Sequence, residues 1–138
     1  MSDLPFVVDA SVICCALLPD ETTDHAVALF QAIGLEGALA PALWQTEVAN
    51  TLTNAMRRDR LSRARRDSGL AGALRLPITS VALGARDIVD RLIPLADAHR
   101  LTAYDASYLL VALERGLALA TLDRALAAAA KREGVAVL

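Results

Sequence analysis

The architecture of this 138-residue chain can be inferred from Pro5-Phe6-Val7-Val8-Asp9-Ala10-Ser11. Three β-forming apolar residues in succession predict a short strand that is buried on both faces. We expect Ser11 to cap a helix over Val12–Leu18, because Pro19 follows and cannot continue a helix. A strand that is buried on both faces and leads directly into a helix is typical of a parallel sheet covered by helices.

The remaining sequence alternates in the same way between helices and short apolar strands. Further helices are predicted from Thr22/Thr23 to Gly34 and over Ala42–Arg58, Ser62–Leu76, Ala85–His99, Thr102–Arg115 and Leu122–Arg132. Further strands are predicted at Ala38–Ala40, Ile78–Val81, Leu117–Ala120 and Val135–Leu138. Pro94 must kink or divide the helix that contains it. This alternation predicts an α/β sandwich that fills residues 1–138 as one domain.

Composition and charge exclude several classes of protein. Hydrophobic residues make up 55% of the chain, which excludes a disordered protein. The net charge is −2, from 14 basic and 16 acidic residues, and this balance excludes a polybasic protein that binds nucleic acid by bulk charge. Any anionic ligand must therefore be held by a local site.

The sequence also predicts a cytoplasmic protein. Cys14 and Cys15 are adjacent, so they rarely meet disulfide geometry, and the chain has no Cys-x-x-Cys pair for zinc. Free cysteines are typical of a reducing compartment. Met1–Pro5 has no basic residue and does not resemble a signal peptide, and no apolar run reaches the roughly 18 residues of a membrane helix.

Three aspartates follow apolar segments rather than polar ones. Asp9 and Asp123 each come after a predicted strand, and Asp105 lies near the start of an apolar helix. Ligands of open α/β sheets bind at the carboxyl ends of the strands, where the helix N-termini also gather. We therefore expect these three carboxylates to meet there, although each one alone could be a helix cap or a loop residue.

A fourth carboxylate, Glu47, lies in the apolar helix 42–58, with Asn50 on the same side. Clustered carboxylates repel one another and call for a cation. Oxygen ligands without a Cys or His cluster favour a hard ion, Mg²⁺ or Mn²⁺. Such an ion activates water and neutralises phosphate charge, and phosphodiester cleavage fits this chemistry best.

At these residues the sequence resembles the PIN-domain ribonucleases, and specifically the VapC-type toxins of toxin–antitoxin pairs. The resemblance runs in order over nearly the whole chain. Its segments are Val7–Ser11, Pro41–Asn50, Leu101–Leu109 and Leu119–Asp123.

The resemblance implies a parallel five-stranded sheet with strand order 3-2-1-4-5, flanked by helices in a three-layer sandwich. It implies that four catalytic residues also hold Mg²⁺ or Mn²⁺, namely Asp9, Glu47, Asp105 and Asp123. It further implies supporting roles for Ser11, Asn50 and Thr121. Some relatives carry another acid just after the last aspartate, where this chain has Arg124-Ala125-Leu126.

The segment Arg57–Arg66 contains six arginines. Arginine binds phosphate through its forked donors, so we hypothesise that Arg57, Arg58 and Arg60 grip the RNA backbone beside the acidic pocket. The alternative is a solvated surface without a ligand.

The sequence thus predicts a cytoplasmic, Mg²⁺-dependent endoribonuclease of the VapC type. The resemblance implies a homodimer and a small cognate antitoxin that blocks the pocket, and no membrane partner. Two alternatives remain open. One is a catalytically inactive PIN-like protein that binds RNA or a partner, and the other is an α/β metal-dependent phosphohydrolase or DNA nuclease.

Overall fold

The structure is a computed structural model and describes residues 5–138. Residues 1–4, on which the expectation about a signal peptide rests, lie outside the described part. The strands are β1 (Phe6–Val8), β2 (Ala38–Pro41), β3 (Ile78–Val81) and β4 (Leu119–Ala120). The helices are α1 (Ala10–Leu17), α2 (Asp24–Glu36), α3 (Trp44–Arg57), α4 (Arg63–Leu74), α5 (Ala85–Asp87), the π-helical turn η1 (Ile88–Leu92), α6 (Ile93–His99), α7 (Ala103–Arg115) and α8 (Arg124–Arg132).

The four strands form one parallel sheet in the order β3-β2-β1-β4. This order agrees with the first four positions of the expected 3-2-1-4-5, but the expectation of five strands is wrong. The segment predicted as the fifth strand makes one isolated parallel bridge, between Val137 and Leu119. Leu119 forms two backbone hydrogen bonds with this segment: its N–H donates to the Ala136 carbonyl at 2.8 Å, and its carbonyl accepts the N–H of Leu138 at 2.9 Å.

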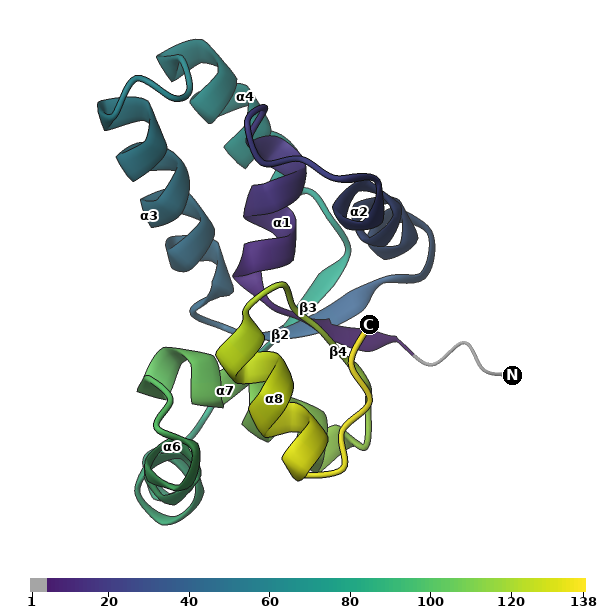
Figure 1. The fold of residues 1–138 in the computed structure, drawn as a ribbon, viewed down its shortest axis with the longest axis vertical. Helices are drawn as coiled ribbons and strands as arrows, with labels where there is room; N and C mark the ends of the chain where they lie inside the picture. The colour runs from purple at the N-terminus through teal and green to yellow at the C-terminus, as the bar shows by residue number, and fades with distance from the viewer. Residues whose placement is uncertain (1–4) are drawn as a thin grey trace.

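The sheet lies between two groups of helices, which confirms the α/β sandwich. Figure 1 shows α1 to α4 on one side of the strands and α6, α7 and α8 on the other. Helix α7 packs directly on β1, β2 and β4. Its residues Ala106–Ala112 are all buried, which explains why this helix is apolar on more than one face.

Two helix boundaries differ from the sequence predictions for local reasons. Asp9, rather than Ser11, is the N-cap residue of α1, and its backbone is extended as a cap requires. Helix α2 continues past Gly34 and ends before Gly37, which has a φ of 81°. Glycine adopts this left-handed region without strain, so the helix ends at the second glycine and not at the first.

The division expected at Pro94 is confirmed. The predicted helix 85–99 consists of α5, the π-turn η1 and α6, and Pro94 lies in the first turn of α6. Proline has no backbone N–H and clashes with the carbonyl four residues earlier, and the wider π-turn before it accommodates this break. None of the helices in the described part of the chain has the length and apolar character that a bilayer crossing requires.

Candidate metal centre and active site

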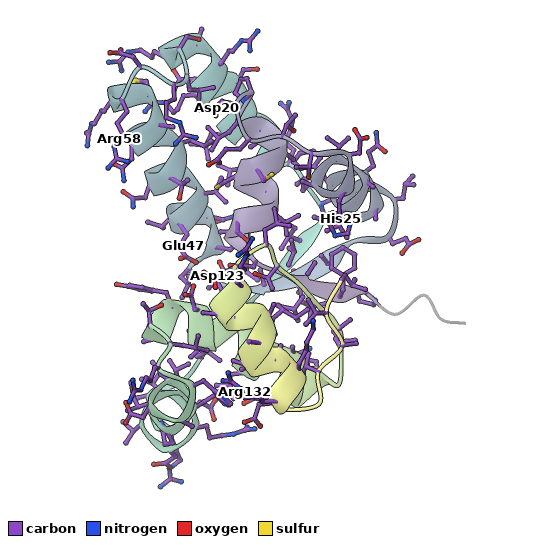
Figure 2. The ribbon with its side chains drawn as sticks, in the orientation of Figure 1. Asp20, His25, Glu47, Arg58, Asp123 and Arg132 are labelled. Carbon is purple, nitrogen blue, oxygen red and sulfur yellow. The ribbon has the colours of Figure 1, made fainter. Side chains whose placement is uncertain are left out.

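An open cavity of about 570 Å³ lies at the carboxyl ends of β1 and β4. The four carboxylates predicted from the sequence all line it, namely Asp9, Glu47, Asp105 and Asp123. In Figure 2, Glu47 and Asp123 lie where the helices on the two sides of the sheet meet. The fold therefore brings together four side chains that are separated by up to 114 positions in the sequence.

Each carboxylate lies at the start of a different helix. Asp9 precedes α1, Glu47 and Asp105 are in the first turns of α3 and α7, and Asp123 is the N-cap residue of α8. The Asp123 Oδ1 accepts the backbone N–H of Leu126 at 2.9 Å. The positive ends of four helix dipoles therefore face the cavity, and each stabilises a carboxylate by about 0.3–1 kcal/mol.

Asp9 is the most enclosed of the four, with 4% of its surface exposed. Its Oδ2 accepts hydrogen bonds from Ser11 Oγ at 2.6 Å and from Thr121 Oγ1 at 2.8 Å. Burial raises the pKa of Asp9, the two hydroxyl donors offset part of that rise, and the charge of Asp123 adds to it. The carboxylate is therefore held in one orientation, and within residues 5–138 it forms no ion pair with a cationic side chain.

The same two hydroxyls also hold the turn that carries Asp123. Ser11 Oγ accepts the backbone N–H of Leu122 at 3.1 Å, and Thr121 Oγ1 accepts the N–H of Asp123 at 3.0 Å. Ser11 and Thr121 each donate to Asp9 and accept from this turn, which ties the start of α1 to the start of α8. Through these hydrogen bonds Ser11 and Thr121 contact the site, and the supporting roles that the resemblance implies for them stay a prediction.

Glu47 and Asp105 also line the cavity and are half-buried. Tyr108 donates its hydroxyl to Glu47 Oε1 at 2.5 Å. Burial raises the pKa of Glu47, the Tyr108 hydrogen bond lowers it, and the charges of Asp9 and Asp105 raise it further. Burial also raises the pKa of Asp105, as do the charges of Asp9 and Asp123. Three carboxyls thus have raised pKa values, partly because each lies near another acid.

Several wall residues were not among the sequence-predicted site residues. They are Ala10, Cys14, Cys15, Glu21, Thr51 and Leu122. Thr51 lies one turn after Glu47, so the spacing of four within α3 is a signal that could have identified it. Asn50, which the resemblance placed at the site, is exposed and is not part of this lining.

The donor set of this cavity fits a hard divalent cation. Burial raises the pKa of Cys14 to about 12, so its thiol keeps its proton and is a poor metal ligand. The Cys15 thiol donates to the Glu21 backbone carbonyl at 3.0 Å. Carboxylate oxygens therefore remain as the ligands, and these favour Mg²⁺ or Mn²⁺. As the side chains stand, no group of three His, Cys, Asp or Glu residues within residues 5–138 is arranged to hold an ion.

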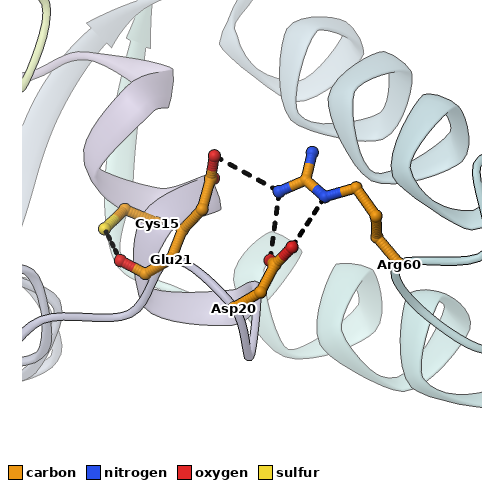
Figure 3. Close-up of polar contacts among 4 residues, drawn as sticks. All are labelled: Cys15, Asp20, Glu21 and Arg60. Atoms are coloured by element: carbon orange, nitrogen blue, oxygen red, sulfur yellow. Dashed lines mark hydrogen bonds and ion pairs between the residues drawn. The ribbon is translucent and has the colours of Figure 1, made fainter.

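The segment Arg57–Arg66, which we call the arginine arm, consists of the end of α3, the turn after it and the start of α4. Arg57 and Arg58 are exposed at the end of α3. Arg60 instead forms a two-point ion pair with Asp20, at 2.8 and 3.0 Å, and also contacts Glu21 Oε1 at 3.2 Å. Figure 3 shows these contacts, which connect the α1–α2 turn to the α3–α4 turn. The guanidinium of Arg60 is thus already engaged, and it shares its single positive charge between Asp20 and Glu21, which lines the cavity.

Comparison with known proteins gives the family of the chain and structures of similar fold. PAE2754 from Pyrobaculum aerophilum has a similar structure, with a TM-score of 0.73 and 27% identity, over 98% of this chain and 84% of that one. FitAcB from Neisseria gonorrhoeae shares the fold, with a TM-score of 0.57 and 22% identity, over 95% of this chain and 94% of that one. No curated protein matches the sequence. Residues 6–132 match the family described as PIN domain, and the chain therefore belongs to the PIN domain family.

Proposed function

We propose that this protein is an endoribonuclease that hydrolyses RNA phosphodiester bonds with Mg²⁺ or Mn²⁺. PIN domains are generally nucleases. The observation that carries the proposal is the convergence of four carboxylates, from the starts of four helices, in one open cavity. Such a cluster is costly unless a cation compensates it, which favours a catalytic site over a structural one.

The residues of the cavity have two kinds of role: some would bind the cation, and others orient the residues that would bind it. Asp9, Glu47, Asp105 and Asp123 would hold the cation. A divalent cation in such a site neutralises phosphate charge and activates water for attack on phosphorus. Ser11 and Thr121 keep the Asp9 carboxylate in one orientation. Among the lining residues of the described chain, none is a His or Lys that could act as a general base.

The test is cleavage of RNA by Asp9→Asn and Asp105→Asn, compared with the wild type and with Asp97→Asn. Asp97 is an exposed acid on α6 and serves as the matched control. We expect both cavity variants to lose Mg²⁺-dependent cleavage while keeping the wild-type circular dichroism spectrum, and we expect the control to remain active. Full activity in either cavity variant would refute the proposal.

The same assay separates the two alternatives. Single-stranded RNA, single-stranded DNA and a small phosphate ester are compared at equal Mg²⁺ concentration. Preferential cleavage of RNA supports the ribonuclease, whereas preference for DNA or the ester supports a DNA nuclease or a phosphohydrolase. Binding of RNA without turnover, at any divalent cation, identifies an inactive PIN-like binding protein.

We also propose, from the resemblance to VapC-type toxins, that the protein is a cytoplasmic toxin that forms a homodimer and binds a small antitoxin. An arginine of the antitoxin would complement the acidic cavity. Exposed apolar side chains lie close together in sequence at Ile88 and Val89 in η1 and at Ile93 at the start of α6, and these support a protein interface. Sedimentation of the protein alone tests the dimer. Co-expression with the product of an adjacent small reading frame, with growth as the readout, tests the antitoxin.

A further inference from the structure

Tyr108 connects the core of the molecule to one of the proposed cation ligands. Its hydroxyl donates to Glu47 Oε1 at 2.5 Å, across 61 positions of sequence and from α7 to α3. The Tyr108 side chain is fully buried, whereas Glu47 is half-buried and lines the cavity. The hydrogen bond therefore joins an immobile side chain to one that borders solvent.

Glu47 needs such a hydrogen bond more than the shorter acids of the cavity. A glutamate has one more rotatable bond than an aspartate, so an unheld carboxylate samples more positions. Asp9 is held by two hydroxyls, and Asp123 is held by the N–H of Leu126. Within residues 5–138, the Tyr108 hydroxyl is the side-chain donor to Glu47, and it contacts only Oε1.

The kind of donor also matters. Glu21, which also lines the cavity, contacts the cationic guanidinium of Arg60, and this contact offsets part of its negative charge. Tyr108 is a neutral donor, because its phenol O–H carries no net charge when it donates to Glu47. The carboxylate of Glu47 is thus oriented without losing the negative charge that a cation requires.

We propose that Tyr108 is a positioning residue, whose hydroxyl fixes the Glu47 carboxylate so that its second oxygen is presented to a divalent cation in the acidic cavity. This inference rests on the proposed metal-dependent function and adds a residue outside the carboxylate set. Tyr108 does not touch the cation or the substrate. It acts through Glu47, in the way that outer hydrogen-bond partners orient metal ligands in other sites.

The test is Mn²⁺ binding, measured by titration calorimetry and by electron paramagnetic resonance without substrate. Tyr108→Phe removes one oxygen from a buried ring and should raise the Mn²⁺ Kd about tenfold. Tyr104→Phe removes the same atom from an exposed tyrosine on the same helix, and its Kd should equal that of the wild type. An unchanged or lower Kd for Tyr108→Phe would overturn the inference.

A double-mutant cycle with Glu47→Gln separates positioning from a general loss of packing. In the Glu47→Gln background, Tyr108→Phe should produce no further change in Kd, because the residue through which it acts is already altered. An equal tenfold rise in Kd in both backgrounds would show that Tyr108 does not act through Glu47. If Tyr108→Phe does not fold, as judged by circular dichroism in EDTA, Tyr108→Met is used in the same cycle.

Failure of this inference is distinguishable from failure of the proposed function. If the wild type binds no Mn²⁺, or if Asp9→Asn binds it as tightly as the wild type, the proposed metal centre fails and the inference fails with it. If the wild type binds Mn²⁺ and Asp9→Asn does not, the metal centre stands, and the Tyr108 variants then decide the inference alone.

Discussion

Thr121 shows how much of the cavity depends on single hydroxyl groups. Its Oγ1 donates to Asp9 Oδ2 and accepts the N–H of Asp123, and only 5% of its surface is exposed. A methyl group in its place would leave a buried carboxylate with one donor fewer and a backbone N–H without its acceptor. Such changes are costly because water cannot replace the missing partner.

Thr121→Val should therefore lower the free energy of unfolding by about 1–3 kcal/mol and slow RNA cleavage about tenfold. Thr121→Ser keeps the hydroxyl and should remain near the wild type in both measurements. Urea denaturation and cleavage rates are the readouts. A valine variant that matches the serine variant would show that the hydroxyl has no role.

The raised pKa of Asp9 predicts the direction of a pH effect. A carboxyl whose pKa is raised by folding binds its proton more tightly in the folded state, so stability falls as the pH rises through the raised value. Asp9→Asn removes this charge, while an Asn oxygen can still accept from Ser11 and Thr121, and Asn is an equally good N-cap residue.

In EDTA, Asp9→Asn should therefore melt at a higher temperature than the wild type at about pH 8. The difference should shrink as the pH falls toward the ordinary Asp value of 3.8. Differential scanning calorimetry over this range is the measurement, with Asp97→Asn as the control. A wild type that is the more stable protein at about pH 8 would contradict the expectation.

At the scale of elements, the ion pairs of Arg60 fix the position of the arginine arm. The pairing of Arg60 with Asp20 and Glu21 connects the arm to the α1–α2 turn beside the cavity. Arg57 and Arg58 remain exposed on the arm, about 15 Å along the helix axis from Glu47. They are the arginines of the predicted RNA-binding set that the structure leaves available to phosphate.

The double variant Arg57→Gln/Arg58→Gln should weaken RNA binding and reduce the dependence of log K on log salt by about 0.7 for each phosphate that is no longer neutralised. Arg132→Gln, on α8 and remote from the arm in Figure 2, is the matched control. Binding is measured in an Asp105→Asn background so that the RNA stays intact. A salt slope equal to that of the control would show that Arg57 and Arg58 do not bind RNA phosphates.

At the scale of the whole molecule, the parallel sheet is what creates the acidic cavity. Parallel strands all end at the same edge, and the helices that follow them begin there, so carboxylates at strand ends and helix starts are forced together. The repulsion among them is a cost of the fold that a bound cation removes. Stability should therefore depend on divalent cations.

Mg²⁺ at about 100 times its Kd should stabilise the wild type by about 2.7 kcal/mol, which corresponds to a rise of several degrees in Tm. K⁺ at equal ionic strength should produce no comparable shift. Asp9→Asn should lose the Mg²⁺ effect, since one ligand charge is gone. Equal shifts with Mg²⁺ and K⁺ would indicate ionic screening in place of a specific site.

Local sequence rules predict most of the elements and all four acids. Thr23, Ser62 and Thr102 lie at the N-caps that hydroxyl residues favour, and Pro94 lies where a helix divides. The acids at the strand ends, Asp9 and Asp123, stand out because apolar strands precede them, and this relation depends on neighbours in the chain alone. Glu47 and Asp105 stand out because their neighbours in the sequence form apolar helices. All four acids line the cavity.

The sequence by itself thus determined an α/β sandwich and a set of carboxylates at strand ends and helix starts, because short-range patterns specify both. Only the tertiary structure decided that Tyr108 contacts Glu47, that Arg60 is committed to Asp20, and that the fifth strand is reduced to a single bridge. Each of these depends on a distance between segments far apart in the chain. Such distances are set by the packing of helices on the sheet, which residue spacing does not encode.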